Sequence, residues 1–326
     1  MILPYALRLL CLCFASFFAL NALAVLVVRV GSKFAIRFAE ARAPRGAAHL
    51  LLALRLLPFA LATLFILGLC VPSYLWLEPA ATSERVGVAC VILGILGAAT
   101  WCVSLTRASR SLLASIRHSR ICARAGIETR LPGESSPITV LEVEAPILAV
   151  SGLFHPRLLV SRGLLAALSA EELDAALRHE RAHHASRDNA KRFLILLAPD
   201  IFPFVHSLRF LDRSWSKIAE WAADDQATSG DSLRALALAA ALVRVASMGT
   251  APRLPILSTS LLAGDVDLAA RVDRLLCVAP LTTSHTRQAH SSLAAVGLLF
   301  ASGLVLLLLV PPVLSAVHEL LELLLH

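Results

Sequence analysis

Four long apolar runs are the strongest constraint on how this chain can fold. A helix needs about 20 apolar residues to cross the roughly 30 Å hydrocarbon layer of a membrane. Four stretches approach or exceed that length, and we expect each to be a transmembrane helix. The first run is longer than the apolar part of a signal peptide, and its strongest charges follow it, so we keep it as a span. The four runs are Leu9–Val30, Leu56–Tyr74, Val86–Leu105 and Leu293–Ser315.

The composition agrees with a membrane protein. The chain is 57% apolar and 16% charged, whereas a soluble domain has about 45–50% apolar and about 25% charged residues. The net charge of +7 comes mostly from arginines beside the apolar runs, which does not resemble the basic stripe of a nucleic-acid-binding protein. The seven cysteines are odd in number and form no C-x-x-C pair, which argues against a disulfide framework and a thiolate zinc site.

The basic residues also predict how the chain is oriented. Cytoplasmic loops of membrane proteins carry an excess of Lys and Arg, and here that excess follows the first and third runs. Both termini are then external, and the segment from Arg107 to His290 is cytoplasmic. The basic residues at the two junctions are Arg29, Lys33, Arg37, Arg42, Arg45, Arg55, Arg107, Arg110, Arg117, Arg120 and Arg124.

These observations divide the chain into three parts. We expect three transmembrane helices in residues 1–106, a cytoplasmic domain in 107–290, and a fourth transmembrane helix with a short external tail in 291–326. Within the cytoplasmic domain, residues 133–160 have the pattern of short strands, and everything after Ser161 has the pattern of helices. The run Phe193–Phe210 is interrupted by two prolines and an aspartate. It predicts a buried or membrane-surface helix pair, and a re-entrant segment stays open.

One predicted helix carries a metal-binding pattern. Ser169 and Glu172 form a capping box, which marks a helix start. At 100° per residue, His179 and His183 share one face, so both can reach a tetrahedral zinc at about 2.0–2.1 Å. Glu180 lies beside them and can act as the general base on a water at the open position. The alternative is a solvated helix that happens to carry two histidines.

A third ligand makes the catalytic interpretation more specific. Glu220 would complete a set of two histidines and one glutamate with an open position, as catalytic zinc requires. Asp224, one helical turn later, can accept a hydrogen bond from the outer nitrogen of a ligand histidine. The alternative is a pair of carboxylates on a helix surface. The sequence therefore predicts a peptide-bond hydrolase with one zinc ion, although another divalent metal could use the same ligands.

These residues resemble a known family. The stretch from Gly152 to Leu165, the His179-Glu-Arg-Ala-His-His segment, Arg187-Asp-Asn and the later Arg271-Val-Asp-Arg-Leu-Leu resemble the BlaR/MecR-type membrane metallopeptidases. The resemblance covers about residues 152–276 and is more distant to HtpX heat-shock and CAAX-prenyl proteases. Three spans, a cytoplasmic peptidase and a fourth span match the BlaR/MecR layout.

The resemblance implies a multi-pass α-helical protein of the bacterial inner membrane with a mainly α (α+β), gluzincin-like peptidase domain. It implies zinc on His179, His183 and Glu220, Glu180 as general base, and Asp224 as the outer acid. The implied partners are membrane lipids and a protein substrate, in that family a BlaI-type transcriptional repressor. No direct nucleic-acid contact is expected, and a homo-oligomer stays open.

The chain also departs from that family. BlaR/MecR sensors carry an external penicillin-binding domain after the last span, whereas this sequence stops at His326, so we do not expect direct β-lactam sensing. The S-x-x-K match at Ser214–Lys217 lies inside the cytoplasmic domain and is attributed to chance. Two alternatives remain: an HtpX-like membrane quality-control protease and a non-catalytic membrane scaffold.

Several further residues carry weaker expectations. We expect a packing or outer-contact role for His184 and a structural role for His155. We expect Asn189 to end or cap the helix that carries His179 and His183. We also expect Arg55 to extend its charge to the membrane interface, and an edge strand within 147–160 to pair with an extended substrate. The candidate donors to a reaction oxyanion are His206, Arg234 and Arg244.

Overall fold

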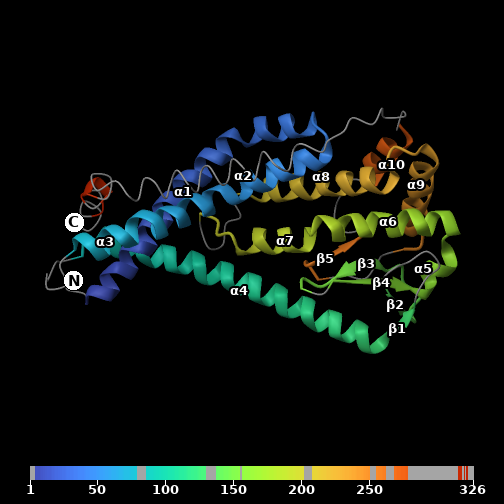
Figure 1. Cartoon of the computed structure of the whole chain (residues 1–326), viewed down its shortest axis with the longest axis horizontal. Coiled ribbons are helices and arrows are strands. Elements are labelled where there is room, and N and C mark those ends of the chain that lie inside the picture. Colours follow the sequence, from blue (N-terminus) through green and yellow to red (C-terminus); the bar gives the residue numbers. More distant parts are fainter. Residues whose placement is uncertain are drawn as a thin grey trace.

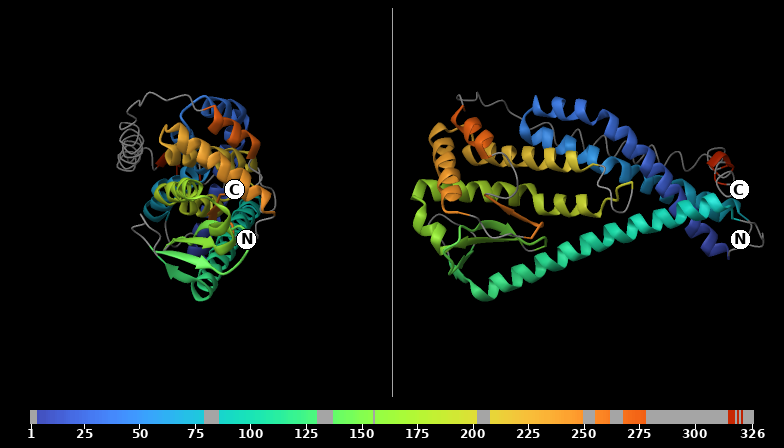
Figure 2. Two further views of the ribbon diagram at one scale, coloured as in Figure 1. Left: turned by 90° about the vertical axis from the view of Figure 1, so that its right-hand side faces the viewer. Right: turned by 180° about the vertical axis from the view of Figure 1, so that it is seen from behind.

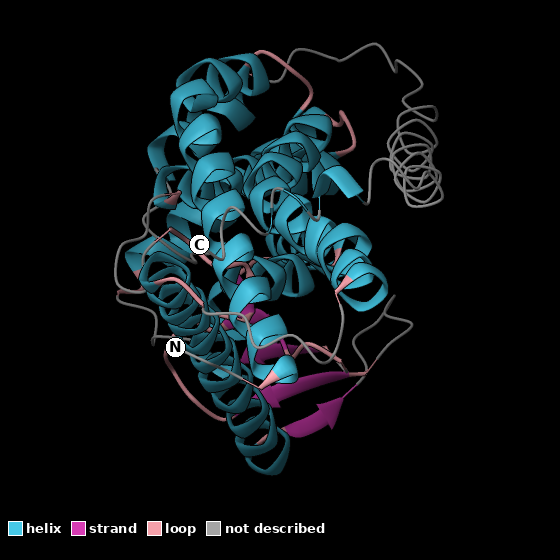
Figure 3. Cartoon of the chain, turned by 90° about the vertical axis from the view of Figure 1, so that its left-hand side faces the viewer, coloured by secondary structure: helices cyan, strands magenta, loops and turns pink. Residues whose placement is uncertain are grey.

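The computed structural model describes residues 4–78, 86–129, 137–154, 156–201, 208–249, 255–261, 268–277, 315–317, 319 and 321. The described chain is mostly helical, with one small sheet at the end remote from the N-terminus (Figures 1 and 3). The fourth predicted span lies almost entirely outside these residues, as do His155 and His206.

Three helical segments are long and apolar enough to cross a membrane: Tyr5–Glu40, Pro44–Leu77 and Val88–Ala125. The first is helix α1 and the third is helix α4. They contain the first three predicted runs apart from Val86 and Gly87, which precede α4, and each extends beyond its run. α4 continues well past residue 106, so the predicted boundary of the membrane part falls inside a helix (Figure 2).

The second segment changes its helical geometry partway along. It consists of α2 (Pro44–Phe65), a π-helical turn η1 (Ile66–Cys70) and α3 (Val71–Leu77). Pro72, the second residue of α3, has no backbone N–H to donate to the turn before it. A wider turn at this point is a known way to accommodate a missing helical hydrogen bond.

Helices α1 and α4 approach each other closely at Gly97. A Cβ atom at this position would lie 2.2 Å from the carbonyl oxygen of Phe14 in α1. Small residues allow such close contact between membrane helices, where packing replaces the hydrophobic effect as the source of stability.

We therefore expect Gly97→Ala to destabilise the protein by roughly 1–3 kcal/mol, the usual cost of overpacking, seen as a lower thermal midpoint in detergent. Gly31→Ala in α1 is the matched control, because no atom lies within 4 Å of its added Cβ. A Gly97→Ala protein as stable as the control would contradict this account of the helix contact.

The domain next to the bundle contains a five-stranded mixed sheet in the order β1-β2-β4-β3-β5. Strands β2 and β4 run parallel, and the other neighbours are antiparallel. Side chains of the sheet pack against α6, α9 and α10 in one apolar core. The strands are β1 (Ile127–Thr129), β2 (Ile138–Leu141), β3 (Leu148–Ser151), β4 (Arg157–Ser161) and β5 (Ser258–Ser260).

The helices of this domain follow the fourth strand. α6 and α8 lie side by side in Figure 1, and α7 continues the line of α6 toward the membrane part. Their bounds are α5 (Arg162–Ala167), α6 (Ala170–Ser186), α7 (Asp188–Leu197), α8 (Arg209–Thr228), α9 (Ser232–Ser247) and α10 (Leu268–Leu276).

The sheet confirms three predicted strands and corrects two expectations. β2 and β3 lie within residues 133–160 as expected, and β4 ends one residue beyond, at Ser161. β5 lies in the part of the chain predicted to be wholly helical. Because β5 pairs with β3, the described strands within 147–160 are internal to the sheet. The expected edge strand for substrate binding was therefore wrong, and the edge beside α6 and α7 is β5.

The membrane helices pack directly onto α8. Trp215, Ile218 and Ala219 of α8 share an apolar core with side chains of α1 and α2, including Leu51. The segment that carries Glu220 is thus held by α1 and α2 on one side and by α6 and α9 on the other.

Arg55 reinforces this junction. Its side chain is 2% exposed, and its Nε lies 2.7 Å from Oδ1 of Asp212 at the start of α8. It also donates to the carbonyl oxygens of Ile195 and Ala198, which lie at the C-terminal end of α7, where carbonyls lack helical partners. Arg55 therefore pairs within the protein, and its expected position at the membrane interface stays a prediction.

Candidate metal centre

Helix α6 begins and is oriented as the sequence predicts. The Ser169 hydroxyl accepts a hydrogen bond from the Glu172 backbone, and the Glu172 carboxylate accepts one from the Ser169 backbone. This capping box satisfies two free amides of the first turn. The helix face that carries Ala176, His179 and His183 is buried against the core.

Three ligand atoms converge between α6 and α8. The Nε2 atoms of His179 and His183 are 3.1 Å apart. Oε2 of Glu220 lies 3.4 Å from the first and 3.5 Å from the second. All three side chains are at most 1% exposed. Among the described residues, this is the one group of three that could hold a metal ion.

The spacing fits a small tetrahedral cation. Two ligands about 2.0–2.1 Å from such an ion are separated by roughly 3.3–3.4 Å, close to the three observed distances. Imidazole nitrogen and carboxylate oxygen are also ordinary zinc ligands. The residues present therefore fit one zinc ion.

Two carboxylates fix the orientation of the histidine rings. Nδ1 of His179 lies 2.9 Å from Asp224, and Nδ1 of His183 lies 2.7 Å from Asp188. Asp188 accepts a hydrogen bond from Nδ1 of His183, Asp224 lies at ion-pair distance from Nδ1 of His179, and the Nε2 atoms of both rings face Glu220. Such outer partners fix the tautomer of a ligand histidine and increase its basicity.

Arg271 of α10 provides a buried positive charge at the site. Its guanidinium donates two hydrogen bonds to Asp224, at 3.0 and 2.7 Å. Its Nη1 lies 3.3 Å from Oε2 of Glu220. The side chain is 3% exposed, so this charge balances part of the negative charge that the carboxylates bring into the core.

Burial and these partners shift the titration of the site. Burial alone lowers the pKa of His183, but the charge of Glu220 and the hydrogen bond to Asp188 outweigh it and raise this pKa to about 10. The pKa of Glu220 is well below its usual value because the histidines and Arg271 outweigh its burial. Burial raises the pKa of Glu180, in spite of the neighbouring histidines.

Metal binding is therefore expected to release protons. Because the pKa of His183 is about 10, this residue carries an extra proton at neutral pH, which a metal must displace. The apparent metal affinity should fall about tenfold for each pH unit below that value, for each proton displaced. Calorimetry in two buffers of different ionisation enthalpy measures the number released. Equal binding enthalpies in both buffers would contradict the prediction.

Other predicted residues lie elsewhere. Arg244 pairs with Glu172 at 3.0 Å and Arg234 with Asp231 at 3.4 Å, so neither faces the three ligand atoms. His184 is exposed rather than packed. Asn189 does not cap α6; its amide donates to the carbonyl oxygens of Val150 and Gly152 at the end of β3.

The sequence pattern alone assigned no role to two residues at the site, Asp188 and Arg271. Asp188 follows Arg187, whose backbone is left-handed with φ of 55°, so helical periodicity does not relate Asp188 to His183. The position of Arg271 could have been noticed in the sequence. Leu268, Val272 and Leu275 form an apolar face of α10, and Arg271 lies on that face. A lone arginine on such a face indicates a buried carboxylate partner.

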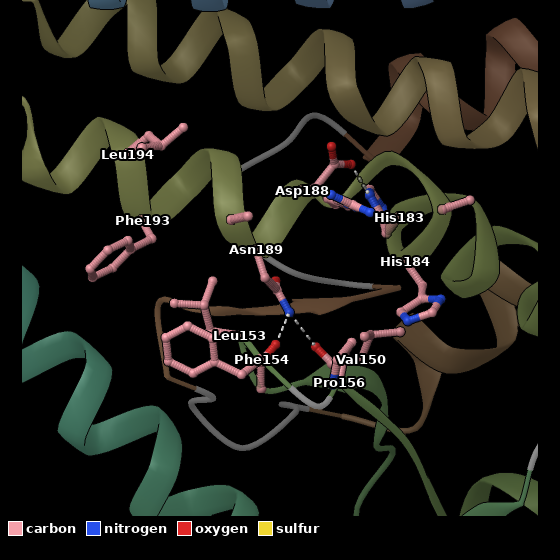
Figure 4. A pocket seen from close by; sticks show the side chains of 14 residues that line it. Val150, Leu153, Phe154, Pro156, His183, His184, Asp188, Asn189, Phe193 and Leu194 are labelled. Atoms are coloured by element: carbon pink, nitrogen blue, oxygen red, sulfur yellow. Dashed lines mark hydrogen bonds and ion pairs between the residues drawn. The ribbon is translucent and has the colours of Figure 1, made fainter.

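A cavity of about 770 Å³ lies beside the site, between α6, α7 and the loop after β3. His183 and Asp188 line one end, and Figure 4 shows Phe193 and Leu194 of α7 at the other. Leu153 and Phe154 lie opposite α7. The lining is largely apolar, and it leads from His183, a candidate metal ligand, toward the C-terminal end of α7.

This arrangement of candidate ligands is typical of a metal-dependent peptidase. Such a site has two ligand histidines one turn apart, a third ligand glutamate from another helix, and a further glutamate between the histidines that acts on water. Residues 149–252 match Peptidase family M48, and this segment is an M48 peptidase domain. The match spans His179, Glu180, His183, Glu220 and Asp224, and ends before Arg271. Together with the three helices that are long and apolar enough to cross a membrane, this match points to a membrane metalloprotease.

No curated protein matches the chain. The family match supports the M48 peptidases in general, and the finer BlaR/MecR assignment stays a prediction.

Proposed function

We propose that this chain is an integral-membrane zinc metalloendopeptidase that cleaves a cytoplasmic protein. In this proposal His179, His183 and Glu220 hold one zinc ion and Glu180 is the general base. The observation that carries it is the convergence of two Nε2 atoms and one carboxylate oxygen, all within 4.8 Å of one another.

The catalytic chemistry divides between the ion and the chain. A zinc ion bound here would lower the pKa of a water molecule and polarise the scissile carbonyl. Glu180 lies on α6 between the two histidines, and burial raises the pKa of its carboxylate above the usual value. A carboxylate with a raised pKa can take a proton from the attacking water and return it to the leaving amine.

A structural metal site is less well supported. Structural zinc sites usually close with four protein ligands, whereas the described residues supply three here. Glu180 is fully buried beside the two histidines, a costly arrangement for a carboxylate that has no role in the chemistry. Both points favour a peptidase over a non-catalytic scaffold.

We further propose that the peptidase domain is cytoplasmic, in a bacterial inner membrane, and that its substrate is a regulatory protein of the BlaI repressor type. The arginine excess at the first and third junctions supports the orientation. The resemblance to BlaR/MecR metallopeptidases supports the substrate class.

A second candidate is quality control of membrane proteins. The cavity beside the site supports it, because Phe154 is 72% exposed and Leu194 is 44% exposed along an apolar lining. Such a surface suits the apolar side chains that misfolded or membrane-derived segments present.

Comparing new protein N-termini in cells that express the parent chain or Glu180→Gln would test these proposals. The signalling proposal expects a cut in a soluble DNA-binding regulator that is absent with the variant. Cuts confined to membrane proteins would favour quality control. No difference between the two strains, with both proteins present in the membrane, would overturn the peptidase proposal.

A further inference from the structure

We propose that a second cavity, remote from the metal ligands, binds the phosphate of an anionic phospholipid. It has a volume of about 530 Å³ and lies where α2, α4, α7 and the start of α8 meet. Arg55, Arg107 and Arg110 line it, together with Asp212. The inference does not depend on the proposed peptidase chemistry.

The charges around the cavity favour an anion. Arg55 is already balanced, with Asp212 at 2.7 Å and Asp200 at 3.7 Å. Arg107 and Arg110 have no ion pair within 4 Å among the described residues, so the three arginines exceed the two aspartates by one positive charge.

Arg107 has unused hydrogen-bonding capacity here. Its Nη2 donates to the carbonyl oxygen of Leu196 at 3.2 Å. Its Nε is buried and has no hydrogen-bond partner within the described part of the chain. A buried donor without an acceptor costs free energy, and a phosphate oxygen would provide the acceptor.

The position along α4 identifies the source of the phosphate. The apolar run of this helix ends at Leu105, and Arg107 and Arg110 follow within the next two turns. Charged residues at the end of a transmembrane run lie at the level of the lipid headgroups. Ile195 and Ile256 also line the cavity, which gives the apolar part of a lipid a surface that free phosphate would not use.

The cavity is connected to the peptidase through α8. Asp212, which pairs with Arg55 at the cavity, lies two helical turns before Glu220 on the same helix. A lipid bound beside this ion pair would therefore contact the junction that positions one of the candidate metal ligands.

Binding of phosphatidylglycerol to the detergent-purified protein, titrated by native mass spectrometry, tests the inference. We expect it to bind more tightly than phosphatidylcholine, and Arg107→Gln/Arg110→Gln to weaken it roughly 25-fold, since each arginine near an anionic membrane surface contributes about fivefold. Arg120→Gln, exposed on the same helix and outside this cavity, is the matched control and should bind as the parent does.

Arg110→Gln alone keeps the test valid if the double variant does not fold, because Arg110 is exposed; it should weaken binding about fivefold. Equal retention of the two lipids, or an unchanged affinity in the arginine variants, would overturn the proposal. Inorganic phosphate at millimolar concentration is the competitor. If it removes the lipid completely, the cavity is a site for free phosphate, and the proposal that it binds a phospholipid is overturned.

Discussion

Glu180→Gln is expected to reduce proteolysis by roughly 10²–10⁴-fold, the usual contribution of a positioned general base, while the metal stays bound. Glutamine keeps the size of the side chain but cannot accept a proton from water. The fully buried position of Glu180, between two candidate ligands on α6, places this loss in the chemical step. Metal content and single-turnover cleavage of an identified substrate measure the two effects separately.

Glu171→Gln is the matched control for this variant. It makes the same chemical change on the same helix, but at an exposed residue of the first turn, and we expect activity close to that of the parent. If Glu180→Gln binds metal and cleaves as fast as this control, Glu180 is not the base.

Glu220→Gln is expected to remove the metal and, with it, the activity. The carboxylate of Glu220 provides the third ligand atom, and an amide is a much weaker ligand for zinc. Asp224→Asn and Asp188→Asn should be milder and cost about 10–100-fold in metal affinity, because they change the partners of the histidines rather than a ligand. Competition with a zinc chelator measures all three.

Gln226→Ala, exposed on the same helix as Glu220, should leave the metal affinity unchanged. The most specific part of this prediction is that Glu220→Gln loses more metal affinity than Asp224→Asn or Asp188→Asn. Metal retained by Glu220→Gln but lost in Asp224→Asn would show that the ligand set has been assigned to the wrong carboxylate.

Much of this site could be predicted from the sequence, because its main residues follow the spacing of one helical turn. His179 and His183 are one turn apart, and the capping box at Ser169 and Glu172 fixes where their helix begins. Glu220 and Asp224 repeat the same one-turn spacing on α8. Helical spacing was therefore enough to select His179, His183, Glu220 and Asp224 as candidate site residues, and the structure places these four side chains together.

What the sequence did not predict depends on contacts between distant segments. Strand β5 is three residues long, and its pairing with β3 gives it backbone partners that no local pattern indicates. Arg55 and Asp212 are far apart in sequence, so their ion pair could not be read from either segment. Arg271 joins the site because α10 packs its apolar face onto the same core.

X-ray absorption at the zinc edge of the detergent-purified protein tests the central claim most directly. We predict one zinc ion with nitrogen and oxygen ligands at about 2.0–2.1 Å and scattering from two imidazole rings. Sulfur at about 2.3 Å, which would bring in cysteines instead of His179, His183 and Glu220, would contradict the account. So would a purified chain that binds no zinc.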